Sequence, residues 1–211
     1  MKRSGGKDPL TATPGFPIRA AGFSLVELLI AAAVGLVVLG AMYSVFTIQN
    51  KTFGNQEQIV ELQQNVRAAM DMMIREIRMA GYDPIEVNSD SDPANNFSGV
   101  PVNASQLQVR ADQNSDGAID ATSEENIVYA YNAANKQITR NIGAGAQPFA
   151  ENIDAFTFAY LDGNGNVTAV SADVRRIEIT ITGRTARPDP AYTANGGYRT
   201  YTLTSVIALR N

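Results

Sequence analysis

A single carboxylate, Glu27, stands at the edge of a long apolar run near the start of the chain. No charged residue occurs in residues 28–50. At ~1.5 Å per residue, this run is long enough to cross a hydrocarbon core of roughly 30 Å as a helix. Because an acid beside such a span is costly in lipid, Glu27 indicates a functional carboxylate whose chemistry is charge pairing.

The residues around Glu27 follow an order that resembles the type IV prepilin signal. A basic leader is followed by Gly22, Phe23, three further residues, Glu27 and the apolar helix. The resemblance implies that prepilin peptidase cleaves between Gly22 and Phe23, that Phe23 is then N-methylated, and that Glu27 is the fifth mature residue. A Sec signal peptide would place its small residues after a shorter apolar stretch, and a plain membrane anchor would not explain Glu27.

The same resemblance implies a partner for Glu27. In that family the helices stack in a staggered bundle, and the glutamate meets the N-terminal amine of a neighbouring pilin. Leaving one member of a buried ion pair alone costs roughly 3–5 kcal/mol, so such a pair would favour docking in one register. Glu27 could instead neutralise the amine of its own chain, and the sequence leaves both partners open.

The composition argues against catalysis. The chain has 211 residues, enough for one domain and an anchor, and contains neither cysteine nor histidine. This removes the commonest general base, the best thiol nucleophile and the usual zinc ligands, so we expect no enzyme. The fold must also hold without disulfides, whereas many pilins close a C-terminal loop with one.

Basic residues are concentrated in the leader. Residues 1–22 carry four basic side chains and one acidic side chain, which leaves −7 for the rest of a chain whose net charge is −4. Positive flanks stay in the cytoplasm, so we expect a single pass through the inner membrane with the C-terminal part in the periplasm. An acidic domain argues against nucleic-acid binding, although four arginines lie close in sequence: Arg175, Arg176, Arg184 and Arg187.

Beyond the span, apolar residues recur at spacings of three and four, which predicts an amphipathic continuation of the helix. The stripe consists of Ile59, Leu62, Val66, Met70, Met73 and Ile77. Gly81, followed by Asp83-Pro84, predicts that one helix of about 55 residues runs from near Phe23 to Ala80. We interpret the methionines as core residues that fill gaps rather than as a metal-binding surface.

From Leu107 onward the apolar period becomes two, which predicts strands. They are expected at residues 107–111, 127–132, 137–141, 155–162, 166–170, 175–182 and 198–209. Turn-like residues between them indicate hairpins of an antiparallel sheet, whose apolar face the helix stripe would cover. The expected fold class is α+β and pilin-like, with the second half of the long N-terminal helix packed on this sheet.

Three later stretches resemble the PilW-type minor pilins and, more distantly, the J-type pseudopilin of type II secretion. They are MIREIRMAGYDP, AENIDAFTFAYLDGNGNVT and VRRIEITITGRT. The expected parts of the chain are a leader (1–22), a membrane-spanning and assembly half of the helix (23–50), an amphipathic half (51–82) and an extracytoplasmic β-rich domain (83–211).

A second group of possible ligands follows the first expected strand. Oxygens at alternate positions and a glycine at 117 resemble the front of an EF-hand calcium loop. The candidate ligands are Asp112, Asn114, Asp116, Asp120 and Glu124. The match then fails, because Ser123 stands where a bidentate glutamate is expected. Ca²⁺ and a polar turn capped by its own side chains both stay open, and no other cofactor is indicated.

Together the resemblances imply a minor pilin that prepilin peptidase processes, that the membrane anchors and that contacts other pilins through its N-terminal helix. It would enter a type IV pilus or prime its assembly. A minor pseudopilin of a type II secretion system is the first alternative. A pilus-tip subunit for adhesion or DNA uptake is a further one, supported only by the clustered arginines.

Overall fold

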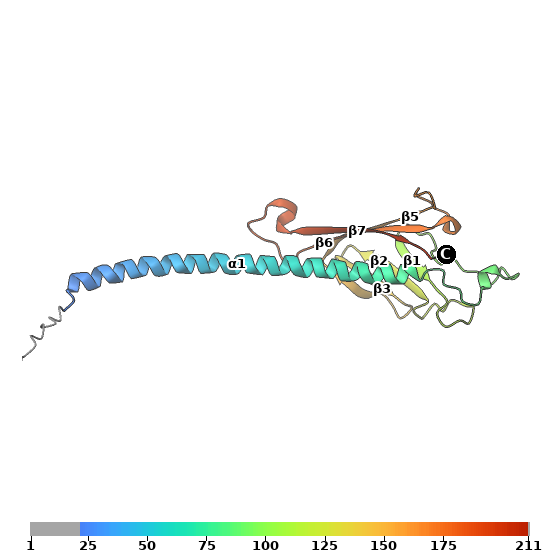
Figure 1. The fold of residues 1–211 in the computed structure, drawn as a ribbon, viewed down its shortest axis with the longest axis horizontal. Coiled ribbons are helices and arrows are strands. Elements are labelled where there is room, and N and C mark those ends of the chain that lie inside the picture. Colours follow the sequence, from blue (N-terminus) through green and yellow to red (C-terminus); the bar gives the residue numbers. More distant parts are fainter. Residues whose placement is uncertain (1–21, 211) are drawn as a thin grey trace, which may run out of the picture. The chain divides into compact units, whose positions relative to one another are not determined.

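The computed structural model describes residues 22–210, so the expected leader, apart from Gly22, lies outside the described residues. The longest element is helix α1, Leu25–Arg78 (Figure 1). Gly81 follows the helix with a φ of 76°, a left-handed conformation that glycine adopts without strain. The prediction of one long helix that ends before Gly81 is therefore confirmed.

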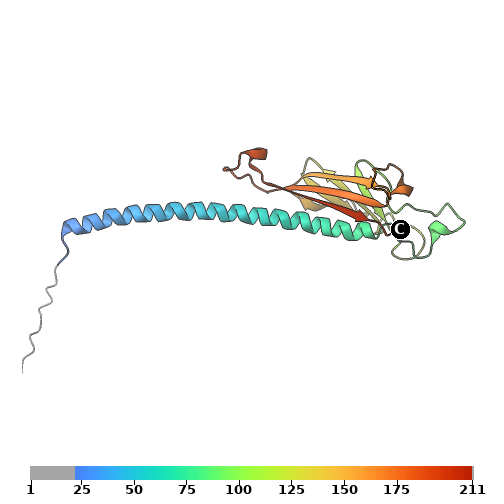
Figure 2. The same cartoon turned by 45° about the horizontal axis from the view of Figure 1, so that its top comes forward.

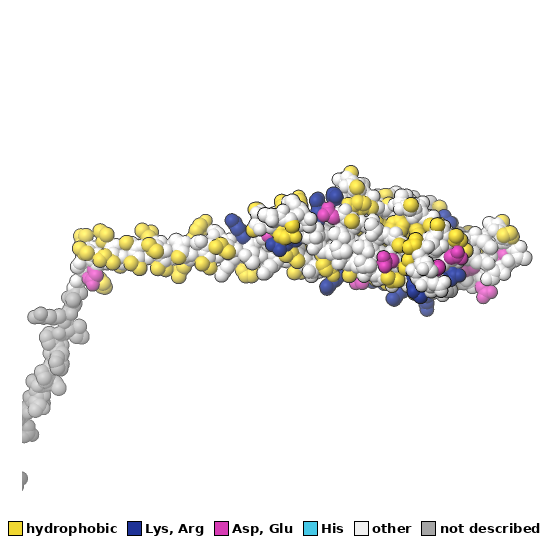
Figure 3. Space-filling view, turned by 90° about the horizontal axis from the view of Figure 1, so that it is seen from above, with side chains coloured by type: hydrophobic (Ala, Val, Ile, Leu, Met, Phe, Trp, Pro, Cys, Tyr) yellow, Lys and Arg dark blue, Asp and Glu magenta, His cyan; other side chains and the backbone are white. Residues whose placement is uncertain are grey.

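The chain forms two compact units, residues 1–50 and 51–211. In the first, every large apolar side chain of the described residues is exposed, from Phe23 to Ile48, and these side chains cover α1 in Figure 3. By length and composition, this part of α1 could cross a membrane. So much exposed apolar surface requires a cover of lipid or of other helices.

In the second unit, strands lie alongside the rest of α1 (Figure 2). The strands form two antiparallel sheets, ordered β1-β2-β3-β4 and β5-β6-β7. The first contains β1 (Gln106–Arg110), β2 (Asn126–Asn132), β3 (Gln137–Asn141) and β4 (Gln147–Glu151). The second contains β5 (Ile153–Leu161), β6 (Arg176–Arg184) and β7 (Thr200–Ala208). Short 3₁₀ helices occupy Val87–Ser89, Ser171–Asp173 and Ala194–Gly197.

The helix stripe and the sheets share one core. The buried residues of α1 are Leu62, Val66, Ala69, Met70, Met73 and Ile77. They confirm five of the six predicted stripe positions, while Ile59 is only partly buried. In β6 the three isoleucines at 177, 179 and 181 are fully buried, as the alternating pattern predicts.

One predicted strand is wrong and one strand was not predicted. Residues 166–170 form no strand and make a single bridge, between Val167 and Leu161. Strand β4 was not predicted, because it contains Pro148, which has no N–H for a strand ladder, and because polar and apolar residues do not alternate in it. The strands were expected to form one sheet, but they form two. The apolar period of a strand shows which face is buried and does not show which strands pair.

A charged contact joins the helix to the first sheet. Glu76 accepts a hydrogen bond from Arg140 Nη2 at 2.9 Å, and the hydroxyl of Tyr129 also donates to Glu76. Both partners of the ion pair have only about 15% of their side-chain surface exposed. Burial raises the pKa of Tyr129 well above its usual value, so its hydroxyl stays a donor. Glu76 is not one of the apolar stripe residues, so the spacing that predicts the helix does not predict this contact.

α1 packs closely against the second sheet at Gly183. A Cβ at this position would lie 2.6 Å from Leu62 Cδ1 and 2.7 Å from Val66 Cγ2. We expect Gly183→Ala to destabilise the protein by about 1–3 kcal/mol, because overpacking forces core side chains apart. Urea unfolding of the detergent-solubilised protein measures the change, and Gly163→Ala, at an open site, is the matched control. Equal midpoints for the two variants would contradict this packing.

Candidate functional site

The helix begins with a reciprocal pair of hydrogen bonds. The Glu27 N–H donates to Ser24 Oγ, and the Ser24 N–H donates to Glu27 Oε2, each at 3.3 Å. This is a capping box, in which two otherwise unpaired N–H groups at the helix start are satisfied. The spacing of Ser24 and Glu27 in the sequence is that of a capping box. The prediction made from the sequence used only the charge of Glu27 and therefore included only its pairing with an amine.

The capping box lies directly beside the predicted cleavage position. Phe23 is 87% exposed, and no atom lies within 4 Å of a Cβ placed on Gly22. The Gly22–Phe23 peptide therefore lies open, immediately before the N-cap residue Ser24. If Phe23 became the N-terminus, its cationic amine would lie at the positive end of the helix dipole. The negative charge of Glu27 would then offset both the charge of the amine and the partial charge of the helix end.

Three of the five predicted calcium ligands, Asp112, Asn114 and Asp116, direct side-chain oxygens at amides of their own loop. Asp112, which is fully buried, accepts hydrogen bonds from Ser115 N at 2.7 Å and Gly117 N at 3.0 Å. Asp116 accepts one from Ala118 N. These are the side-chain caps of a polar turn. Among residues 22–210, no three acidic, histidine or cysteine side chains are arranged to hold a metal ion.

The acid that closes this loop is Glu125 rather than Glu124. Glu125 is buried and accepts hydrogen bonds from the amides of Gln113, Asn114 and Asp120. Glu124 is instead 67% exposed and lies 3.7 Å from Arg140. The loop is thus fixed by two buried carboxylates, and Ca²⁺ could bind only if Asp112 and Asp116 turned away from their amides.

Calcium binding by this loop stays a prediction with a direct test. If Ca²⁺ binds to the folded protein only, millimolar calcium raises the melting temperature by mass action. An Asp116→Ala variant should lose that rise, because Asp116 is exposed and its removal leaves Asp112 and Glu125 in place. An unchanged melting temperature, or the same rise in Asp116→Ala, would leave only the capped turn.

The four arginines do not form one basic patch. Arg175 and Arg176 lie at one end of β6 and donate to backbone oxygens of Ala172, Val174 and Gly163. Arg184 lies at the other end of β6, 3.8 Å from Asp154 and stacked on the ring of Tyr198. The proximity in sequence that favoured a DNA-uptake role is therefore not retained in space.

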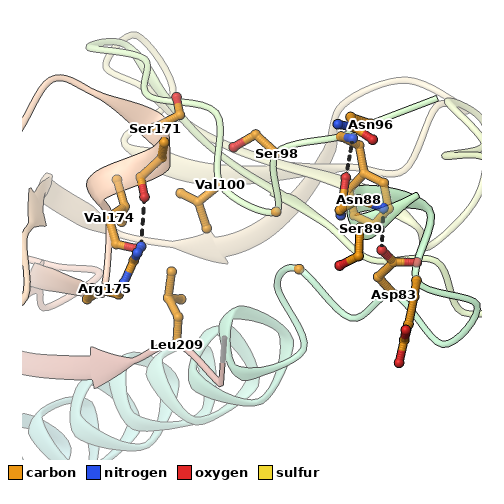
Figure 4. A pocket seen from close by; sticks show the side chains of 15 residues that line it. Asp83, Asn88, Ser89, Asn96, Ser98, Val100, Ser171, Val174, Arg175 and Leu209 are labelled. Carbon is orange, nitrogen blue, oxygen red and sulfur yellow. Dashed lines mark hydrogen bonds between the residues drawn. The ribbon is translucent and has the colours of Figure 1, made fainter. Parts of the chain in front are cut away.

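A cavity of about 790 Å³ is lined in part by residues that follow the helix, among them Gly81 and Asp83 (Figure 4). Its polar side chains brace its own walls. Asp83 accepts from the amides of Val87 and Asn88, Arg175 Nη1 donates to two carbonyls, and Ser171 Oγ accepts from Val102 N. These hydrogen bonds hold the loop segments around the cavity together. Among the lining residues, no nucleophile is paired with a base as in a catalytic site.

Two family models match the chain, one over the amino-terminal segment and one over most of the remaining residues. A family model described as "Prepilin peptidase-dependent protein B" matches residues 55–208. A second, described as "Prokaryotic N-terminal methylation motif", matches residues 18–43 and so contains Gly22, Phe23 and Glu27. No curated protein matches the chain.

Among solved structures, a type IV-like pilin from Thermus thermophilus is similar to this chain. The two are 12% identical, and the match covers 70% of this chain and 95% of the pilin, with a TM-score of 0.41.

Proposed function

The chain belongs to the family described as prepilin peptidase-dependent protein B, and from this membership we propose that it is a PilW-type minor pilin of a type IV pilus. The observation that carries the proposal is the match to the methylation motif, and it is supported by the open Gly22–Phe23 peptide directly before a helix with an exposed apolar half. Both features suit a subunit that is first anchored in the membrane and then packed among other helices.

In this proposal, the leader stays in the cytoplasm and residues 51–211 are periplasmic. Prepilin peptidase cleaves after Gly22, and Phe23 is N-methylated. The apolar half of α1 then leaves the lipid for the helical bundle of the fibre, where neighbouring helices replace the lipid as its cover. Glu27 pairs there with the amine of a neighbouring subunit, which sets the register of docking.

A gene deletion separates the pilus from the type II secretion alternative. We expect the deletion strain to lose most of its surface pili, counted by electron microscopy, while secretion of exoproteins is unchanged. Re-expression of the wild-type chain should restore the pili. A deletion strain with normal pili and reduced secretion would instead assign the chain to a secretion pseudopilus.

A further inference from the structure

Strand β7 forms an open edge of the second sheet and lacks the features that usually protect such an edge. It is nine residues long, and it contains no charged residue and no proline. Its pairing with β6 runs without a register shift from Thr200 to Ala208. Long, flat and uncharged edges of this kind pair readily with an added strand.

The hydrogen-bonding direction of β7 can be followed from its two ends. Leu209 N donates to Arg175 O, and Arg199 O accepts from Thr185 N, each at 2.9 Å. Because the direction of the backbone groups alternates along an antiparallel strand, the N–H and C=O groups of the odd-numbered residues of β7 point toward β6. The N–H and C=O groups that point outward are those of Thr200, Thr202, Thr204, Val206 and Ala208. Within residues 22–210, the backbone of β7 makes no hydrogen bond outside its ladder with β6.

The other sheet edges are each covered or interrupted. On β1, Arg110 bonds through its carbonyl to Gly81 N and through its amide to Gly99 O. Strand β4 contains Pro148, and its pairing with β3 has a register shift. Strand β5 has a register shift near its start, and Tyr160 O accepts from Thr168 N near its end. The unprotected edge of β7 is therefore a local feature rather than a general property of the domain.

An apolar strip lies beside this edge on the side of α1. Tyr201 and Leu203 are only partly buried, although they border the core. Arg67 lies over the ring of Tyr201, 6.0 Å from its centroid, which places this flank of α1 beside the start of β7. Val60 and Ile74 are seven residues before and after Arg67 and so share its flank. A strand added to β7 would cover this strip.

Basic side chains outnumber acidic ones along this strip. Arg67 lies at the Tyr201 end, and Arg78, Arg210 and Asp83 line one small cavity at the other end. Asp71, one turn after Arg67, is the acid on the same flank of α1. We propose that β7 takes up an extended, proline-free strand of another exported protein, uncharged in its middle and acidic at an end, by β-strand addition.

A second copy of this chain does not fit the same edge. From Arg67 to Arg78, α1 runs in the same direction as β7 from Tyr201 to Arg210. An antiparallel pair of β7 strands would therefore place the Lys51 ends of the two helices at opposite ends of the pair. Two copies could then not enter one membrane from the same side. A parallel pair would place Arg210 beside Arg210, which is repulsive.

The test uses the full-length chain in its own cells, with the photocrosslinker p-benzoylphenylalanine at Val206. This side chain is 52% exposed on β7. The control position is Thr157, which is also exposed but lies on β5, two strands away. We expect an adduct with one other protein from Val206 and none from Thr157, and the attached peptide should be a proline-free segment with an acidic residue near its end. The amount of cleaved protein, measured in the same cells, reports processing separately.

A pair of variants tests whether the contact is made by the backbone. Thr204→Pro removes an outward N–H without disturbing the ladder to β6. Thr204→Val keeps that N–H and removes only the hydroxyl, which lies 2.8 Å from the hydroxyl of Thr180. Loss of one backbone hydrogen bond should lower the adduct yield about tenfold in the proline variant, with little change in the valine variant. Four results would each overturn the proposal. They are equal adduct yields in the two Thr204 variants, equal yields from Val206 and Thr157, the absence of any adduct, and an adduct between two copies of this chain.

Discussion

Replacing Gly22 by leucine is expected to leave nearly all of the protein in the membrane at the size of the precursor. The physical reason lies in the peptidase rather than in this chain. No atom lies within 4 Å of a Cβ at Gly22, so the larger side chain disturbs nothing in the described structure. A peptidase site that fits glycine tightly would instead have no room for the side chain of leucine. An immunoblot of membrane fractions distinguishes precursor from mature protein by size.

The matched control for this variant is Gly15→Leu, which makes the same change within the leader but away from the proposed cleavage position. We expect it to be processed like the wild type. A Gly22→Leu protein of mature size would show that cleavage does not depend on Gly22.

Glu27→Ala is expected to leave membrane insertion and cleavage largely intact and to reduce incorporation into the fibre by at least about tenfold. The loss of about 1.4 kcal/mol would suffice for that factor, and removing one partner of a buried pair costs roughly 3–5 kcal/mol, because the other charge is left unpaired. The measurement compares processed protein in sheared pili with processed protein in the inner membrane. Wild-type incorporation by the alanine variant would remove Glu27 from the assembly mechanism.

The capping box makes a second variant necessary, because Glu27→Ala removes both the charge and the hydrogen bond to Ser24 N. Glutamine can still accept that bond at the third helical position, but it carries no charge. If Glu27 pairs with an amine, Glu27→Gln should fail in assembly as the alanine variant does. If Glu27 acts only as a cap, Glu27→Gln should assemble normally.

The helix could be predicted from the sequence because its signals are local. The spacing of Leu62, Val66, Met73 and Ile77 fixes a face, and Gly81 fixes an end, without reference to the rest of the chain. The buried isoleucines of β6 could be predicted for the same reason. In each case one period decides which side chains are buried.

The features that were missed depend on partners distant in sequence or on the path of a loop. Glu76 meets Arg140, which lies 64 positions later in the sequence, only after the helix, the connector and the first three strands have come together. Glu125 rather than Glu124 closes the acidic loop, because the turn decides which of two adjacent acids points inward. Strand pairing, and with it the open edge of β7, is likewise set by tertiary contacts, since alternation alone does not specify a neighbour.

The most direct test is mass spectrometry of the N-terminal peptide of this chain in sheared, purified pili. The account predicts that the chain is present in that fraction and begins at Phe23 with an N-methyl group. An intact leader on the chain in wild-type pili, or the absence of the chain from the pilus fraction while mature protein remains in the membrane, would contradict it.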